Sequence, residues 1–319
     1  MPRTARHKST EAAFYHLTNR VAGRPDWFPL ENPQARRKFL DMMVFYVNAY
    51  RCRLAAFQIM GNHYHLIVHF EKPRSLSREE LKKSTHKLYG EQAEKKTADW
   101  TDVQWEALNR RLFDVSRLMA DVNGLYARWF NRQFGRRGHF WSDRFKNSEL
   151  LGMEAVQDAV LYVELNAVRA GLANRPEQWK WGSARWRRLG KDEDLIPLEE
   201  LFPSVPGTDV YGGYRARLYY RGAVPTKDNQ AAIPQWILQQ EERRGFARAG
   251  AFRQRLRFLT DGLAVGPAEK VAQLLDAYRQ QGRYRRRRHP IPQLGGVLFS
   301  IRIHPPRFQR YPKTSRIIY

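Results

Sequence analysis

The sequence predicts an α+β fold, in which an antiparallel sheet packs against helices and a mainly helical, basic region follows. Segments rich in aromatic and β-branched residues at 14–21, 52–60, 63–70 and 139–150 are typical of strands. Segments with apolar residues at helical spacing lie between and after these strands. The resulting order, β-α-β-β-α-β-α, is the split, ferredoxin-like pattern.

Each element has its own local signal. Residues 34–50 carry apolar side chains at helical spacing, and Pro33 suits a helix entrance. Gly61-Asn62 is a tight-turn dipeptide, so the strands on either side of it form a hairpin. Further helices are predicted over 76–96, 104–134 and 153–171, the last of which ends at the stop residue Gly171.

The charge of the chain indicates a polyanionic partner. Among 319 residues, 56 Lys and Arg stand against 32 Asp and Glu, which gives a net charge of +24. With 42% hydrophobic residues the chain can bury a core, which excludes a disordered basic protein. Nucleic acid is the first expected partner and an anionic membrane surface the second.

Several other classes of protein are excluded or disfavoured. No apolar run is long enough to span a bilayer, and the N-terminal residues show no secretory signal. Cys52 is the single cysteine, which excludes a disulfide framework and a cysteine-based zinc site within the chain. A cytoplasmic location is therefore expected.

The third predicted strand carries a possible metal site. Because strand side chains alternate between faces, His63, His65 and His69 lie on one face of HYHLIVHF. Histidines at i and i+2 can bring both imidazoles to one metal ion. Equally, His63 and His65 could be half-exposed strand residues beside a turn.

The last predicted helix carries a possible nucleophile. Tyr162 and Asn166 are at i and i+4, so they are neighbours on one helical face. One interpretation gives Tyr162 a nucleophilic hydroxyl beside an amide ligand. The other makes Tyr162 a core tyrosine and Asn166 a surface amide, and spacing alone favours this second interpretation.

Taken in order, the motifs resemble a known family. GNHYHLIVH at 61–69 followed by YVELNAVRAGL at 162–172 is similar to the single-tyrosine HUH transposases, and most similar to the REP-associated tyrosine transposases. HLTNR at 16–20 and GRRGHFWSDRFKN at 135–147 also resemble this family's pattern. Asn166 stands where many relatives have Gln. The resemblance covers roughly residues 10–190 and implies the HUH endonuclease fold there.

The resemblance implies an enzyme that cleaves and rejoins single-stranded, hairpin-bearing DNA at palindromic repeats. A divalent metal ion, Mg or Mn, would be held by His63, His65 and Asn166. Tyr162 would form a 5′-phosphotyrosine intermediate and release a 3′-hydroxyl, which makes the reaction covalent catalysis without nucleotide hydrolysis. Two alternatives remain open: a non-catalytic nucleic-acid-binding protein of the same fold, and a metal-dependent phosphodiesterase that activates water.

DNA contacts are expected from cationic and aromatic side chains around these motifs, because cations bind phosphates and aromatic rings stack on unpaired bases. The candidates are Arg20, Arg136, Arg137, Phe140, Trp141, Arg144 and Lys146. Each could instead be a solvated charge or a core aromatic.

The predicted domain organisation has three parts. Residues 10–190 form the transposase-like domain, and 214–280 form a helical accessory region that could bind DNA. Residues 281–319 form a flexible basic arm, because no acidic residue occurs from 277 onwards. We expect no membrane partner, and we expect association with the bacterial nucleoid. A homodimer is left open.

Overall fold

The strands of the protein pair into one mixed sheet. The structure is a computed structural model, and it describes residues 8–24, 26–202, 209–225, 230–243, 263–281, 290–293 and 298–301. The strand order is β2-β3-β1-β4-β5-β7-β6. The strands are β1 (Ala13–Arg20), β2 (Cys52–Ile59), β3 (His63–Phe70), β4 (Lys146–Leu150), β5 (Ala264–Gly266), β6 (Ile291–Gln293) and β7 (Leu298–Ile301).

The first four strands have the predicted arrangement. In the order β2-β3-β1-β4 every neighbouring pair is antiparallel. This is the pattern of a split βαβ unit, in which a strand lies between the two strands that a helix connects. The predicted hairpin is confirmed, with Gly61-Asn62 between β2 and β3.

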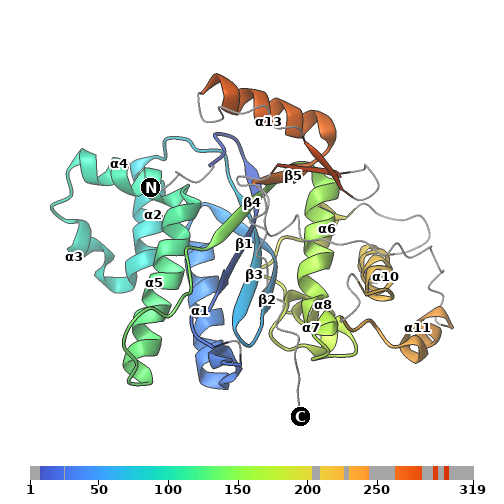
Figure 1. The fold of residues 1–319 in the computed structure, drawn as a ribbon. Helices are drawn as coiled ribbons and strands as arrows, with labels where there is room; N and C mark the ends of the chain where they lie inside the picture. Colours follow the sequence, from blue (N-terminus) through green and yellow to red (C-terminus); the bar gives the residue numbers. More distant parts are fainter. Residues whose placement is uncertain are drawn as a thin grey trace, which may run out of the picture.

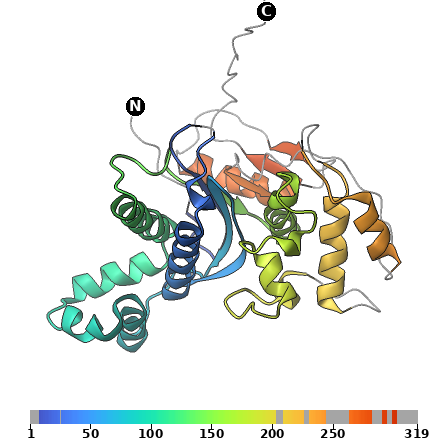
Figure 2. The same ribbon diagram turned by 90° about the horizontal axis from the view of Figure 1, so that it is seen from below.

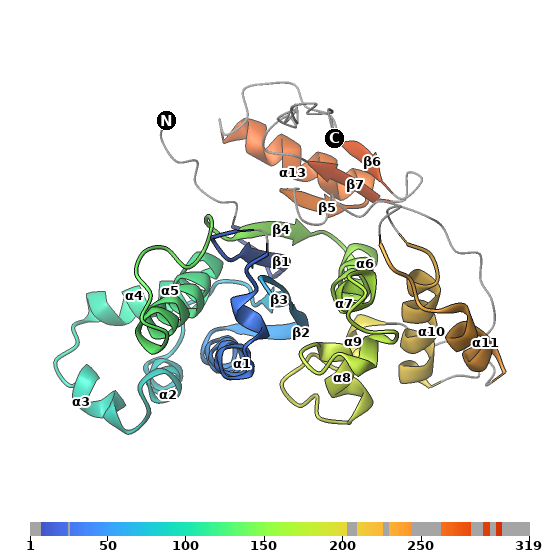
Figure 3. The ribbon, with the colours of Figure 1, turned by 60° about the horizontal axis from the view of Figure 1, so that its bottom comes forward.

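Helices cover both faces of this sheet (Figures 1 and 3). One face packs against α1 (Pro33–Ala49) and α5 (Val115–Gln133), and the other packs against α6 (Met153–Glu164). The short helix α7 (Asn166–Arg169) continues α6 after a break at Leu165. The predicted helix over 153–171 is therefore two helices, and it ends beside Gly171 as expected.

The remaining helices lie outside these layers. Helices α2, α3 and α4 project from the α1 side, and α10 and α11 are outermost on the α6 side (Figures 2 and 3). Their bounds are α2 (Arg78–Tyr89), α3 (Ala93–Thr97), α4 (Asp102–Leu112), α8 (Ser183–Arg188), α9 (Leu198–Leu201), α10 (Val210–Gly222), α11 (Gln235–Glu242) and α13 (Ala268–Gln280). Short 3-10 turns occupy Pro29–Glu31, Gly90–Gln92 and Pro176–Gln178.

Two predicted elements are divided or shortened for local reasons. The helix predicted over 104–134 breaks at Asp114, whose Oδ1 accepts from the amide of Ser116 at 2.7 Å and so caps a new helix, α5. The strand predicted over 139–150 begins only at Lys146. Before it, Trp141 forms an isolated bridge with Val21, and the Phe140 ring packs into the core.

The C-terminal region differs most from its prediction. Strand β5 pairs in parallel with β4, and β7 joins β5 to β6, so this region extends the same sheet. Over 214–280 the structure has helices α10, α11 and α13, and also strand β5, which the helical prediction lacks. The segment 281–319, which is predicted to be a flexible arm, includes β6 and β7, and these two strands pair in the sheet. Apart from residues 281, 290–293 and 298–301, this segment lies outside the described residues.

Candidate functional site

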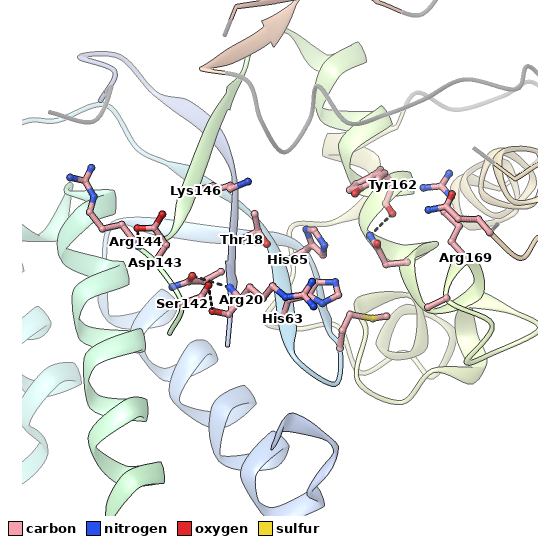
Figure 4. A pocket seen from close by; sticks show the side chains of 15 residues that line it. Thr18, Arg20, His63, His65, Ser142, Asp143, Arg144, Lys146, Tyr162 and Arg169 are labelled. Atoms are coloured by element: carbon pink, nitrogen blue, oxygen red, sulfur yellow. Dashed lines mark hydrogen bonds between the residues drawn. The ribbon is translucent and has the colours of Figure 1, made fainter. Parts of the chain in front are cut away.

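The predicted metal and tyrosine motifs meet in one cavity of about 410 Å³ (Figure 4). It is lined by Thr18, Asn19, Arg20, Met60, His63, His65, Ser142, Asp143, Arg144, Lys146, Tyr162, Asn166, Arg169, Ala170 and Gln230. Strands β1 and β3 supply its floor, and the α6–α7 junction supplies one wall.

Strand register explains the floor of the cavity. His63 pairs with Arg20 and His65 pairs with Thr18, while Lys146 of β4 pairs with the other side of Thr18. Because side chains alternate along a strand, this places the two histidines, Thr18 and Lys146 on the face that α6 covers. The prediction that His63 and His65 share a face is confirmed, with ring centres 5.2 Å apart.

Hydrogen bonds orient both imidazoles. His63 Nδ1 is 2.8 Å from Asn62 Oδ1, an acceptor, so Nδ1 carries the proton and Nε2 keeps its lone pair. His65 Nδ1 is 2.9 Å from His16 Nε2, and the Nε2 atom of His65 takes no part in that bond. A second polar group that fixes ring orientation is typical of metal-binding histidines.

Burial keeps both histidines neutral. Burial, with the positive charge of Arg20 added, lowers the pKa of His63 to about 4. Burial and the neighbouring His16 and His63 hold the pKa of His65 well below its usual value. Neutral imidazole is the form that binds a metal ion, so at pH 7 no proton has to be displaced.

The helix break places Tyr162 and Asn166 opposite the histidines. The ring of Tyr162 stands edge-on to His65, with ring centres 5.7 Å apart. Asn166 Nδ2 donates to the Tyr162 carbonyl at 2.9 Å and to the Val163 carbonyl at 3.3 Å. These bonds tie the Asn166 amide to the last turn of α6, and they leave Asn166 Oδ1 as an acceptor.

A buried network anchors the helix that carries Tyr162. Glu164 accepts from Ser183 Oγ at 2.6 Å and from the Tyr214 hydroxyl, and Arg187 lies 3.8 Å from the same carboxylate. Burial raises the pKa of Glu164, an effect that Arg187 opposes. These contacts on the far side of α6 hold the tyrosine side chain in a defined direction.

The donor set suits a divalent ion. Two imidazole nitrogens and one amide oxygen fit a borderline ion such as Mn better than Mg, which prefers oxygen ligands. Among the described residues, no three His, Cys, Asp or Glu side chains are grouped to hold a metal ion. A set of two histidines and an amide is compatible with that finding.

The cavity is strongly cationic. Four of its side chains are basic, and Asp143 is the one carboxylate on its wall. Three of the predicted phosphate contacts, Arg20, Arg144 and Lys146, are exposed and line it. The site therefore matches an anionic substrate such as a phosphodiester.

Four other predicted DNA contacts lie elsewhere. Phe140 is 1% exposed, and Trp141 donates its Nε1 hydrogen to the Asn123 carbonyl at 3.0 Å. The Phe140 ring is therefore too buried to stack on a base, whereas the half-buried Trp141 ring packs against the core and its stacking stays a prediction. Arg137 is exposed outside the cavity, and the Arg136 guanidinium lies over Trp27 at 4.1 Å.

Sequence reasoning missed two residues of the site. His16 is buried and hydrogen-bonded to His65, and alternation along the first strand places it on the same face as Arg20. Arg169 lies two helical turns beyond Tyr162, so helical spacing could have found it. Both residues stand in motifs that carry the family resemblance, but residue type and spacing gave neither of them a role.

No protein-family model matches the chain, and no curated protein matches its sequence. A solved structure described as a REP-associated tyrosine transposase bound to a REP hairpin is similar in fold, with 13% sequence identity and a TM-score of 0.40. The match covers 66% of this chain and 94% of that one. No helix among the described residues combines the length and hydropathy needed to cross a membrane.

Proposed function

We propose that this protein is a DNA strand transferase that cleaves and rejoins single-stranded, hairpin-bearing DNA through Tyr162. One observation carries the proposal: His63, His65, Tyr162 and Asn166, from two segments far apart in the sequence, line one cationic cavity. A structural role would not require these side chains to converge. The hairpin substrate, and association with palindromic repeats, come from the family resemblance of the motifs.

The chemistry is an in-line exchange of phosphodiester bonds. The Tyr162 hydroxyl oxygen attacks the scissile phosphorus, the bond to the 3′-oxygen breaks, and the departing 3′-oxygen ends as a hydroxyl. Overall, the proton lost by the phenol is balanced by the one gained at the 3′-oxygen. Attack by a 3′-hydroxyl on the 5′-phosphotyrosine reverses these changes and reseals DNA.

Each group of the cavity has a part in this exchange. His63 and His65, with Asn166 Oδ1, would hold a divalent ion, which when bound neutralises charge on the phosphate. Arg20, Arg144 and Lys146 hold flanking phosphates by charge. The network around Glu164 keeps Tyr162 aligned, because a displaced nucleophile loses much of its rate.

The test uses a labelled DNA hairpin with a randomised single-stranded flank, incubated with Mn and analysed on denaturing gels. Wild type is expected to form a covalent adduct, and Tyr162→Phe is expected to form none. Tyr211→Phe, a half-buried tyrosine on α10, is the matched control and should keep the adduct. Sequencing of the captured strand then identifies the preferred flank.

Two results would contradict the proposal. Cleavage that persists in Tyr162→Phe would indicate a phosphodiesterase that activates water. Salt-sensitive binding of the whole hairpin pool, with neither cleavage nor adduct in wild type, would indicate a binding protein without catalysis.

A further inference from the structure

Arg169 is a buried cation on the wall of the cavity. It is the last residue of α7, is 6% exposed and places its guanidinium carbon 5.4 Å from the centre of the Tyr162 ring. The helix ends in a Schellman motif, with Gly171 N bonded to Val168 O and Leu172 N bonded to Ala167 O, both at 2.9 Å. The backbone that presents Arg169 is therefore well defined.

The guanidinium lacks the hydrogen bonds that burial normally demands. Arg169 Nε and Nη1 are buried and have no hydrogen-bond partner in the part of the chain that the structure describes. Arg187 is 5% exposed and its Nε is also unpartnered, but its Nη2 donates to the Ala55 carbonyl at 2.8 Å and it lies beside Glu164. Unpaired buried donors cost stability, and those that face a cavity are available to a ligand.

Its charge is not neutralised either. The charged or ionisable groups that act on Arg169 are the Tyr162 phenol and Arg221, and Arg221 is itself paired with Asp158. Burial lowers the pKa of Arg169 to about 10, which still leaves it positive at pH 7. A buried positive charge beside an open cavity, without a carboxylate, is complementary to an anion.

We propose that Arg169 is a catalytic residue that binds the scissile phosphate beside Tyr162. Its Nε and Nη1 hydrogens donate to non-bridging oxygens of the phosphodiester, and the resulting charge-assisted bonds hold the phosphorus near the Tyr162 hydroxyl. This inference rests on the proposed function, which does not itself require Arg169.

Arg36 offers a matched control. It is also 6% exposed and also has two unpartnered buried nitrogens, but it lies between Trp179 and Trp181, outside the cavity. Methionine replaces either arginine with a side chain of similar length and no charge. Arg36→Met and Arg169→Met therefore differ in whether the removed cation faced the cavity.

The first measurement needs no DNA cleavage. Thermal unfolding of the full chain is followed as inorganic phosphate replaces chloride at constant ionic strength. Phosphate is expected to raise the Tm of wild type and of Arg36→Met. The rise in Tm should be much smaller in Arg169→Met. In chloride alone, Arg169→Met is expected to melt no lower than wild type, because an unpaired buried charge is removed.

The second measurement is the rate of adduct formation on the hairpin pool. Arg169→Met is expected to slow it about 10²–10³-fold, the usual loss when one donor to a transition-state charge is removed. The rate of adduct formation by Arg36→Met should stay within about twofold of the wild-type rate, because Arg36 lies outside the cavity and donates no hydrogen bond to the phosphate. Arg169→Gln replaces the methionine variant if that one does not fold.

Several results would overturn the inference. One is that phosphate does not raise the Tm of wild type, and another is that it raises the Tm of Arg169→Met equally. A third is that Arg169→Met forms the adduct at the wild-type rate. The last is that neither Arg169 variant folds. If wild type forms no adduct with any DNA, the proposed function fails, while the phosphate shift still decides whether Arg169 binds an anion.

Discussion

The two faces of the sheet differ in the kind of side chain that they bury. On the face covered by α1 and α5, buried aromatic rings pack together and their polar atoms have partners. Tyr64 donates to Asn123 Oδ1 at 2.9 Å, and Tyr126 donates to the Ala35 carbonyl at 3.0 Å. On the face covered by α6, small aliphatic residues give way at one end to histidines, a tyrosine and an unpartnered arginine.

This difference between the two faces suggests that one face mainly stabilises the fold and the other mainly binds a ligand. The aromatic face buries large rings in a closed, hydrogen-bonded core, which is how a domain gains stability. The α6 face opens where two buried donors of Arg169 have no partner among the residues that the structure describes, which costs stability and leaves groups for a ligand. Four predictions, from the largest expected effect to the smallest, test this separation.

Phe39→Ala should have the largest effect, and it should be on stability. Phe39 is fully buried on the aromatic face, with ring centres 4.7 Å from Tyr64 and 5.1 Å from Tyr126. The free energy of unfolding should fall by about 3–5 kcal/mol. Urea unfolding measures this loss. If the folded variant also loses hairpin binding at low temperature, the two faces are not separable.

His65→Ala should remove metal affinity, with His69→Ala as its matched control on the same face of β3. His65 lines the cavity, whereas His69 packs against Phe14, with ring centres 4.3 Å apart. Calorimetric titration with Mn should show a loss of at least about 10²-fold for His65→Ala, since even supporting residues of metal sites cost 10–100-fold. An equal loss in His69→Ala would place the metal elsewhere.

Arg144→Gln should change the salt dependence of DNA binding more than Arg137→Gln does. Both arginines are exposed, but only Arg144 lines the cavity. Loss of one phosphate contact should reduce the slope of log affinity against log salt by about 1. Fluorescence anisotropy at several salt concentrations gives the slope. The opposite ranking would move the DNA path away from the cavity.

Trp141→Phe should have the smallest effect and should act on stability alone. The change keeps a half-buried ring but removes the donor to the Asn123 carbonyl, which should cost about 1 kcal/mol of unfolding free energy. Oligonucleotide affinity should change less than about twofold, because the ring packs against the core and its indole hydrogen is used within the protein. A tenfold loss of affinity in the folded variant would restore the predicted stacking role.

Much of the fold was predictable because its signals are local. Alternation in HYHLIVHF, the Gly61-Asn62 turn and the glycine at 171 each depend on neighbouring residues, and the structure confirms them. The break at Asp114 was missed because a cap competes with helical periodicity, and periodicity alone favours a continuous helix. The parallel pairing of β4 with β5 joins segments far apart in the sequence, for which no local pattern exists.

The candidate site shows the same division. The motifs identified His63, His65, Tyr162 and Asn166 by residue type and spacing, and strand and helix geometry then dictates which of them share a face. Only the tertiary structure brought the histidine strand and the tyrosine helix together, buried Phe140, and left two Arg169 nitrogens without a partner among the described residues. Burial and hydrogen-bond satisfaction depend on every element that packs around a side chain, so they cannot be assigned from one segment.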